Sequence, residues 1–283
     1  MPELPEVETV RAGLQARIAG RVLSRVDLRR KDLRIPFPPR FRERLEGQRL
    51  ESVGRRGKYL VLRFDGGPAL IAHLGMSGRM IVREGGDPPP NSPGSDPHEH
   101  VLLEFTGGVS VAYRDPRRFG LMTLAEEDEL MSHPLLATMG PEPLGVGFNG
   151  TVLLRAFRGR RASVKALLMD QRVVAGLGNI YVCEALFRGG IAPAHAAGRL
   201  RAPRVERLAG AVQGVLTDAI AAGGSSLRDY VQVSGGLGYF QQQWKVYGRE
   251  GRPCGSCRAR ARCRVERIVQ SGRSTFWCSR RQR

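Results

Sequence analysis

The spacing of apolar residues predicts a helix at the start of the chain and a series of short strands after it. Apolar side chains at helical intervals predict one helix over about residues 2–19. Between residues 21 and 124, short alternating segments rich in β-branched residues are separated by glycine, which is typical of an antiparallel sandwich or barrel. The apolar stripe of the helix is Leu4, Val7, Val10, Leu14 and Ile18, and the expected strands include residues 22–28, 49–53, 59–64, 69–73, 80–83, 101–105 and 109–113.

Helical spacing replaces this alternation after Pro134. The segment GPEPLGVGFNG at residues 140–150 is typical of a linker. Helical patterns follow at residues 151–158, 163–170, 179–188 and 204–222, and loops rich in glycine, proline or serine are expected at 85–97 and 223–238. The chain is therefore predicted to be an α+β protein with a β-sandwich domain at 1–139, a linker at 140–150, a helical domain at 151–245 and a cysteine-bearing hairpin at 246–283.

The charge of the chain predicts a polyanionic partner. The net charge is +18, and residues 249–283 hold eleven Arg and two Glu, a net of +9, so half of the excess lies in this tail. Such a balance is typical of a nucleic-acid binder. The chain has no apolar run of about 18 residues and no apolar signal segment, so neither a membrane span nor secretion is expected. We therefore expect a cytoplasmic protein.

The first residues offer reactive chemistry. Removal of Met1, which is usual before a small residue, would leave Pro2 with a secondary amine whose pKa lies near about 8. The unprotonated amine can attack an electrophilic carbon to give a covalent iminium, and the neighbouring Glu3 is a ready acid. The alternative is that Pro2 simply begins a helix and the glutamates favour its dipole.

Two turns and one lysine extend the candidate site. The turns at residues 73–79 and 114–120 each place an apolar tip, Met76 or Phe119, beside arginine. Such tips either enter a base stack or fill the core of the protein. Lysine is rare among the 45 basic residues, and Lys58 lies between a basic turn and a strand. Its position suits phosphate contact or proton transfer.

Four of the five cysteines lie in the last thirty residues, two of them as Cys-x-x-Cys. In a cytoplasmic protein this pattern favours zinc over a disulfide. A second knuckle would need cysteine at position 281, where Arg281 stands, so Cys263 either supplies a fourth thiolate or the tail is a basic hairpin without metal. The expected ligands are Cys254, Cys257, Cys263 and Cys278, whereas Cys183 is expected to be an inert core thiol.

A glycine-rich turn at residues 175–178 precedes one of the predicted helices. Asn179 occupies the position expected for the N-cap of that helix, because a short polar side chain there accepts a hydrogen bond from the first turn. The free amides of a helix N-terminus suit a phosphate, although an ordinary capped helix explains the pattern equally well. The basic charge of the chain favours contact with a DNA backbone.

Taken together, these motifs resemble those of the bacterial formamidopyrimidine-DNA glycosylase family, in the same order and over essentially the whole chain. The resemblance implies a β-sandwich followed by a helix-two-turn-helix domain and a zinc-ribbon-like hairpin. It also implies a partner, damaged double-stranded DNA, from which oxidised purines such as 8-oxoguanine and formamidopyrimidines are removed. The motifs that carry it are residues 1–11 (MPELPEVETVR), 56–60 (RGKYL), 73–76 (HLGM), 115–120 (DPRRFG), 178–181 (GNIY) and 272–276 (GRSTF).

The resemblance also assigns roles to residues. Pro2 matches the nucleophile that forms the Schiff base, and Glu3 matches the acid that assists opening of the deoxyribose. Lys58 matches the donor for β-elimination and Arg273 the donor for δ-elimination. Further matches are the DNA contacts His98, Arg117, Arg160, Lys165 and Asn179, and the trio Met76, Arg117 and Phe119 that fills the gap left by the everted base.

Two other functions are compatible with parts of the pattern. An endonuclease VIII-like glycosylase would prefer oxidised pyrimidines, but the opening Leu-Pro-Glu-Val-Glu and the Met76, Arg117 and Phe119 trio favour the purine branch. A non-catalytic DNA-binding homologue would fit the altered cysteine hairpin, whereas intact Pro2, Glu3 and Lys58 favour turnover. One zinc per chain is expected. A monomer is also expected, because an enzyme with one active site on a duplex needs no half-site symmetry.

Overall fold

The computed structural model describes residues 1–85, 96–225, 233, 236–257 and 263–283. The chain forms two compact units, Met1–Ala137 with Ala222–Tyr239, and Thr138–Ala221 with Phe240–Arg283. The boundary at Ala137 lies close to the predicted one, while residues 222–239 group with the first unit. The predicted scheme of 1–139, 140–150, 151–245 and 246–283 stays a prediction. Most of the loops predicted at 85–97 and 223–238 lies outside the described residues.

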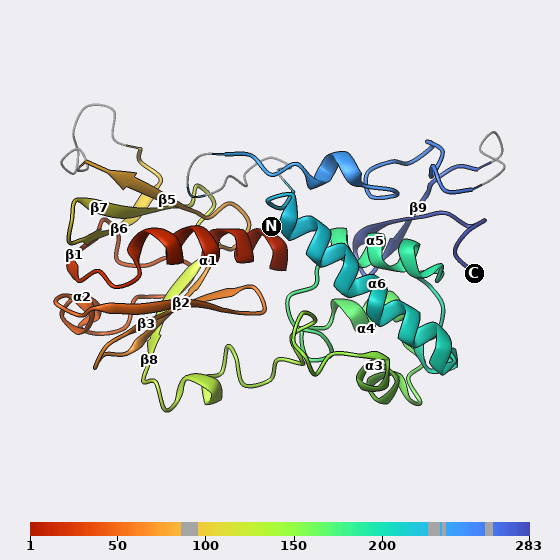
Figure 1. The fold of residues 1–283 in the computed structure, drawn as a ribbon, viewed down its shortest axis with the longest axis horizontal. Helices are drawn as coiled ribbons and strands as arrows, with labels where there is room; N and C mark the ends of the chain where they lie inside the picture. Colours follow the sequence, from red (N-terminus) through yellow and green to blue (C-terminus); the bar gives the residue numbers. More distant parts are fainter. Residues whose placement is uncertain (86–95, 226–232, 234–235, 258–262) are drawn as a thin grey trace. The chain divides into compact units, whose positions relative to one another are not determined.

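Two antiparallel four-stranded sheets form the first unit, as the alternating pattern predicted (Figure 1). One sheet has the order β1 (Leu23–Leu28), β6 (Glu99–Phe105), β7 (Val109–Arg114) and β5 (Arg79–Glu84), and the other has the order β2 (Leu50–Arg56), β3 (Tyr59–Phe64), β4 (Ala69–His73) and β8 (Leu121–Ala125). The strand β8 and the short helix α2 (Phe41–Leu45) were not among the expected elements.

Helix α1 (Leu4–Ile18) packs against both sheets through its contacts with β2, β3 and β5 (Figure 1). The five residues of the predicted apolar stripe are all buried, and four of them join the core cluster that includes residues of both sheets. Burial of a side chain of this size is worth about 1.5–3 kcal/mol, so the stripe anchors the helix that begins next to Pro2.

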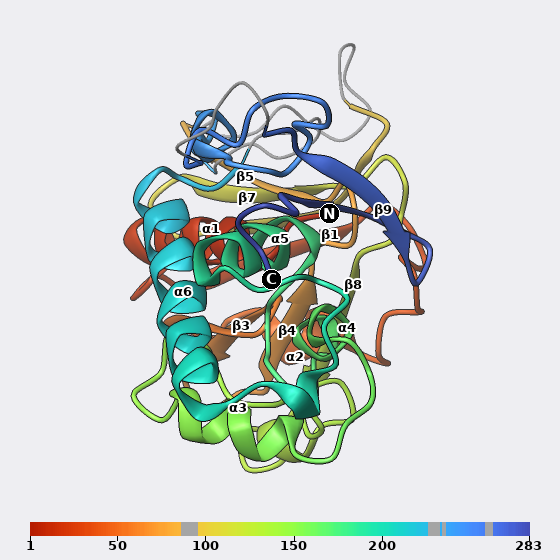
Figure 2. The same cartoon turned by 90° about the vertical axis from the view of Figure 1, so that its right-hand side faces the viewer.

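Four helices form most of the second unit, close to the predicted positions. They are α3 (Gly150–Phe157), α4 (Val164–Met169), α5 (Asn179–Gly189) and α6 (Ala202–Ala221). Helix α6 packs on α5 and α3, and α4 packs on α5 (Figure 2). One detail of the prediction was wrong: Gly178 is the N-cap of α5, and Asn179 is its first residue, so the Asn179 side chain is available for another contact.

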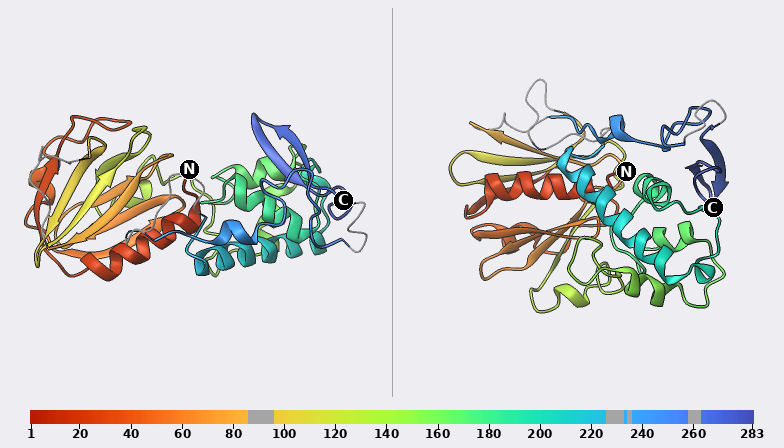
Figure 3. Two further views of the ribbon diagram at one scale, coloured as in Figure 1. Left: turned by 90° about the horizontal axis from the view of Figure 1, so that it is seen from above. Right: turned by 45° about the vertical axis from the view of Figure 1, so that its right-hand side comes forward.

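The chain ends in the hairpin of β9 (Glu266–Gln270) and β10 (Arg273–Trp277), and β10 packs on α5 (Figure 3). Ser271 and Gly272 form the tip, both with left-handed backbone angles, φ +48° and +71°. Short 3-10 helices lie at Leu130–Ser132, Ala197–Arg199 and Phe240–Gln243. Among the described residues, no helix combines the length and the apolar character needed to span a membrane.

Candidate active site and cysteine cluster

Two buried carboxylates close the first turn of α1. Pro2 is buried, and Glu3 and Glu6 are only 4% and 2% exposed. The Glu3 N–H donates to Glu6 Oε2 at 2.9 Å, and the Glu3 side chain accepts from the backbone of Glu6, which completes a capping box. The Ser225 N–H donates to the other oxygen, Glu6 Oε1, at 2.8 Å. The residue that follows Pro2 is therefore held in one backbone position.

Lys58 lies in the tight turn between β2 and β3 and is 7% exposed. His73 ends β4, and its ring lies 4.7 Å from the ring of Tyr59. Burial, followed by the positive charges of Lys58 and Arg34, lowers the pKa of His73 to about 4. The Gly75 N–H donates to His73 Nδ1 at 3.0 Å, which also requires the ring to be neutral. The His73 ring near Lys58 therefore carries no charge at neutral pH.

The apolar tips of the two candidate turns project from the surface. Met76 is 37% exposed and Phe119 is 44% exposed. The Arg117 guanidinium lies over the Phe119 ring, 4.8 Å from its centroid. A cavity of about 380 Å³ is lined by both tips, and Met1 lines it too; its complete lining is Met1, Arg34, His73, Gly75, Met76 and Phe119. The start of the chain and the two turns therefore share one hollow of the first unit.

His98 stands just before β6 in the same unit and is half-buried. Its N–H donates to Asp96 Oδ1 at 2.8 Å, and its carbonyl accepts from the Asp115 N–H at 2.9 Å. Both bonds use the backbone of His98 and hold this residue next to Asp115, the second residue of the turn at residues 114–120.

A second hollow, of about 230 Å³, lies in the second unit between α4 and the hairpin. Lys165 and Arg273 both line it. Lys165 is 3% exposed and its Nζ donates to Thr275 Oγ1 of β10, while Arg273 is exposed beside the hairpin tip. The Asn179 Nδ2 donates to the Ser274 carbonyl at 2.8 Å. Two predicted DNA contacts, Lys165 and Asn179, thus lie at the same hairpin as Arg273, the predicted donor for δ-elimination.

Arg160 does not line this hollow. It is exposed in the turn after α3, where its N–H donates to the Phe157 carbonyl at 3.0 Å. Gly159, with φ of +70°, makes that turn possible. The guanidinium stands on the protein surface, a placement that suits contact with a phosphate but does not join it to Lys165 and Arg273.

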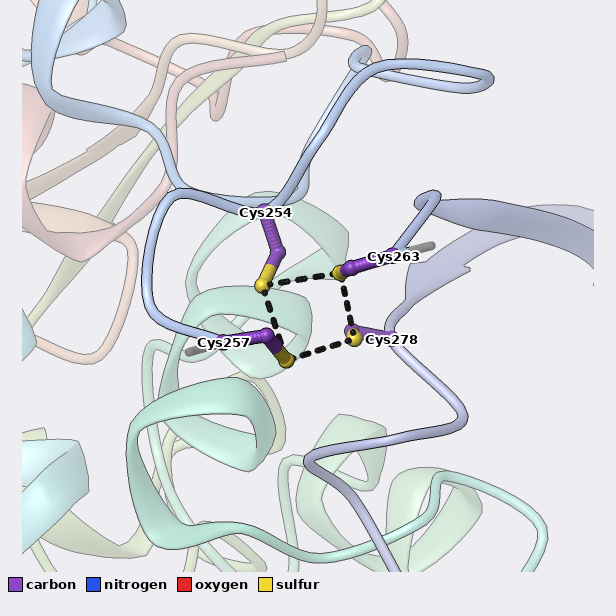
Figure 4. A group of neighbouring side chains, drawn as sticks. All are labelled: Cys254, Cys257, Cys263 and Cys278. Carbon is purple, nitrogen blue, oxygen red and sulfur yellow. Dashed lines mark hydrogen bonds between the residues drawn. The ribbon is translucent and has the colours of Figure 1, made fainter. Parts of the chain in front are cut away.

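The four predicted cysteine ligands come together at the base of the hairpin (Figure 4). Adjacent Sγ atoms are 3.3–3.7 Å apart, and all four lie within 4.8 Å of one another. Tetrahedral zinc with Zn–S bonds of about 2.3 Å requires sulfur separations of about 3.8 Å, so the arrangement fits a four-thiolate site. Cys263 occupies the position of the fourth ligand, for which the sequence had left two interpretations open.

Arg281, which stands where a second knuckle would need cysteine, has a structural contact instead. Its guanidinium lies 5.0 Å from the Phe187 ring centroid, and its Nε donates to the Phe187 carbonyl at 3.2 Å. Gln282 accepts from the Cys278 N–H at 2.8 Å and donates to the Ile191 carbonyl at 2.9 Å. The end of the chain is thus attached to α5 and to the loop after it.

Sequence reasoning missed several buried polar residues that hold these sites. Glu184 is 4% exposed, and its carboxylate accepts from three consecutive backbone N–H groups, residues 245–247, at 2.8–3.1 Å. Burial raises the pKa of Glu184, and these three donors oppose the rise. Glu6 was also missed, although the Glu-x-x-Glu spacing is a signal of a capping box. The distant partners, Ser225 for Glu6 and residues 245–247 for Glu184, lie too far along the chain to be predicted.

Comparison with known proteins covers the whole chain. The formamidopyrimidine-DNA glycosylase N-terminal domain matches residues 1–122, and the H2TH domain of the same enzymes matches residues 139–231. The formamidopyrimidine-DNA glycosylases of Cereibacter sphaeroides and Rhodospirillum centenum are 54% and 55% identical to this chain over 285 and 295 residues, and each match covers 100% of both proteins.

Solved structures agree with this result. The crystal structure of the MutM (Fpg) protein from Thermus thermophilus is 38% identical, has a TM-score of 0.85, and the match covers 99% of this chain and 98% of that one. The complex between the Lactococcus lactis Fpg and DNA with an abasic site is 31% identical, with a TM-score of 0.87 and 100% of both chains covered. The predicted fold class is confirmed, and the chain belongs to the formamidopyrimidine-DNA glycosylase family.

Proposed function

We propose that this chain binds damaged double-stranded DNA, excises oxidised purines through a Schiff base at Pro2, and then cleaves the strand by β,δ-elimination. The chain is a DNA glycosylase of base excision repair with AP lyase activity, as its family is. The proposal concerns the residues that perform each step. The observation that carries it is the buried N-terminal turn, in which Glu3 and Glu6 fix the backbone next to Pro2.

The reaction begins after Met1 has been removed. The Pro2 nitrogen attacks C1′ of the damaged nucleotide, the bond from C1′ to the base breaks, and the base leaves with the electron pair and gains the proton that the Pro2 nitrogen loses. Glu3 gives a proton to the ring oxygen as the deoxyribose opens, which leaves an iminium between Pro2 and C1′. The capping box suits this role because it holds the Glu3 carboxyl beside Pro2 in a nearly water-free place.

The iminium makes the C2′ proton acidic. When this proton is lost, its electron pair forms the double bond between C2′ and C3′, and the 3′ phosphate leaves with the electron pair of the C3′–O bond. Lys58 is the proposed donor for this β-elimination, and Arg273 is the proposed donor for the δ-elimination on the other side of the sugar. Neither step requires a redox cofactor. The burial of Lys58 and the exposure of Arg273 support different tasks: Lys58 exchanges protons within a site, whereas Arg273 can meet a phosphate at the surface.

The remaining predicted residues are proposed to grip the DNA. Lys165 and Asn179 each donate to a residue of β10, and Arg273 begins this strand, so we assign phosphate contacts to this side of the hairpin. Such contacts position a duplex without reading its sequence. His98, Arg117 and Arg160 add further contacts to the strands. Met76, Arg117 and Phe119 fill the space left by the everted base, a role that their exposed tips support.

We propose that Cys254, Cys257, Cys263 and Cys278 hold one zinc ion per chain. Four thiolates leave no open position on a tetrahedral ion, so the metal would stabilise the hairpin and take no part in the reaction. Native mass spectrometry should find one zinc per chain. Cys263→Ser should weaken its retention against a chelator, whereas Cys183→Ala should retain it. Unchanged retention in Cys263→Ser would show that Cys263 is not a ligand.

The function is tested on two duplexes, one with 8-oxoguanine opposite cytosine and one with thymine glycol. Protein lacking Met1 should excise 8-oxoguanine faster than thymine glycol, and borohydride should trap a covalent complex whose yield falls sharply in Pro2→Gly. Faster excision of thymine glycol would favour an endonuclease VIII-like enzyme, and binding without excision would indicate a non-catalytic homologue. A monomeric state and a cytoplasmic location remain part of the proposal; sedimentation of the DNA-free protein tests the first.

A further inference from the structure

Two turns of the first unit carry the side chains proposed to enter the base stack, and both turns are attached to a single buried carboxylate. The turn at residues 73–79 carries Met76, and the turn at residues 114–120 carries Arg117 and Phe119. Asp115, at the start of the second turn, is 0% exposed. A carboxylate in such a place requires donors, because a buried charge without them is costly.

Three donors reach the Asp115 carboxylate. The Ser77 hydroxyl donates to Oδ1 at 2.5 Å, and the Tyr113 hydroxyl and the Gly120 N–H donate to Oδ2 at 3.1 and 2.8 Å. Burial, and then the charge of Asp115, raises the pKa of Tyr113, so the Tyr113 hydroxyl keeps its proton and stays a donor. One side chain therefore connects the first turn, the strand β7 and the far end of the second turn.

The backbone of Asp115 is fixed as well. Its N–H donates to the His98 carbonyl at 2.9 Å, and its own carbonyl accepts from His100 Nε2 at 2.9 Å. His100 is 2% exposed. Both bonds lead toward β6, so neither the peptide nor the carboxylate of Asp115 is free to move with the exposed part of the turn.

Ser77 connects the two turns directly. While its hydroxyl donates to Asp115, its Oγ accepts from the Arg117 N–H at 3.2 Å. The turns also touch through their backbones: a Cβ on Gly75, which has φ of +62°, would lie 2.4 Å from the carbonyl carbon of Phe119. The positions of Met76, Arg117 and Phe119 are therefore set together and not one at a time.

We infer that Asp115 is a positioning residue for base eversion, and that with Ser77 and Tyr113 it presents Met76, Arg117 and Phe119 to the duplex as one preorganised unit. The inference rests on the proposed role of these three side chains. Everting a base requires the gap to be filled as the stack opens, so a loosely held filler would have to be ordered in the same step. Asp115 itself is too deeply buried to touch DNA.

The test compares a substrate that needs eversion with one that does not. Single-turnover excision is measured on duplex DNA with 8-oxoguanine opposite cytosine, and strand cleavage is measured on single-stranded DNA that carries an abasic site. Asp115→Ala should slow excision about 10- to 100-fold, and Ser77→Ala and Tyr113→Phe should slow it less. All three should cleave the single strand within about twofold of the natural chain.

Ser110→Ala is the matched control, because Ser110 is a buried hydroxyl residue near the opposite end of the same strand, β7. It should leave both rates unchanged. Equal loss of both activities, or no loss on the duplex, would overturn the inference. If Asp115→Ala does not fold, Ser77→Ala and Tyr113→Phe decide by the same criterion. Failure of the proposed function is distinguishable, since the natural chain would then excise nothing.

Discussion

Pro2 follows Met1 at the start of a helix whose first turn is buried, whereas Arg273 stands exposed at the tip of a hairpin near the other end of the chain. The first turn is held by carboxylates, Glu3 and Glu6, that accept from backbone N–H groups. The hairpin is held by a cluster of thiols and by polar contacts to α4 and α5, among them those of Lys165 with Thr275 and of Asn179 with Ser274. In the proposed function, the covalent step therefore depends on the folded core of the first unit, and the contact of Arg273 with DNA depends on the separately supported hairpin.

The two regions differ in what can disturb them. Apolar burial along α1 supports the N-terminal turn without a ligand. The hairpin has few apolar partners of its own, and its cluster includes Cys183 and Phe187 of α5. A domain this small commonly needs a structural metal or disulfides. The described part of the tail contains no disulfide, and its cysteines are free thiols. Removing the metal should therefore disturb the position of Arg273 and leave the position of Pro2 unchanged.

The largest effect is expected from Glu3→Gln, which breaks the chemistry of the first region and keeps its shape. The amide retains an acceptor for the capping box but cannot donate the proton that opens the sugar. Excision of 8-oxoguanine should fall about 10²- to 10⁴-fold. Cleavage at a preformed abasic site should fall less, because that sugar already equilibrates with its open aldehyde. Equal losses on both substrates would contradict the assigned role.

The next effect is expected from Cys278→Ser, which breaks the second region. Loss of one thiolate should release zinc and lower the affinity for duplex DNA about 10- to 100-fold, as measured by fluorescence anisotropy. Borohydride trapping on a single-stranded abasic site should persist, because Pro2 belongs to the other unit. Cys183→Ala should retain both metal and affinity. Trapping lost in proportion to affinity would contradict the division between the regions.

A smaller effect is expected from Glu6→Gln. Glu6 accepts two backbone N–H groups, and glutamine leaves one of them facing an NH₂ group. The free energy of unfolding should fall by about 1–3 kcal/mol in urea denaturation. Glu51→Gln, on an exposed position of β2, should change it by less than about 0.5 kcal/mol. Similar values for both variants would show that the Glu6 contacts do not hold the turn.

The last effect is absent at neutral pH and appears only in acid. The pKa of His73 is about 4 in the folded chain and near 6.5 when unfolded, so between these values only the unfolded state takes up the proton. His73 should therefore not contribute to the pH dependence above pH 6.5 and should cost roughly 1–3 kcal/mol of stability as pH falls toward 4. His73→Asn should flatten that part of the stability curve. Parallel curves for the two proteins would contradict the buried neutral ring.

Local patterns predicted most of the fold. The strands at residues 59–64 and 69–73 and the helix α1 follow directly from period-two and helical spacing. The strand β8 was missed because it directly follows the turn at residues 114–120. The N-cap of α5 was assigned one residue late, because Asn179 uses its side chain for Ser274, a partner that lies 95 residues away.

The residues proposed for catalysis are visible in the local sequence, whereas the contacts that support them are not. Pro2 and Glu3 belong to one short motif, whereas Glu6 meets Ser225 across 219 residues, a pairing that no local spacing contains. Cys263 shows the same limit. Its position in the sequence left two interpretations, and only the folded hairpin places its Sγ 3.3 Å from the sulfurs of both Cys254 and Cys278. A short local motif can indicate which residues react, whereas the contacts that position them join residues far apart in the chain.

The most direct measurement maps the covalent bond. Protein without Met1 is mixed with duplex DNA that carries 8-oxoguanine opposite cytosine, reduced with borohydride and digested, and the adduct is located by tandem mass spectrometry. The proposal predicts a reduced sugar on the nitrogen of Pro2, in the peptide that begins Pro2-Glu3-Leu4. An adduct on Lys58 or another lysine, or no adduct while excision proceeds, would contradict it.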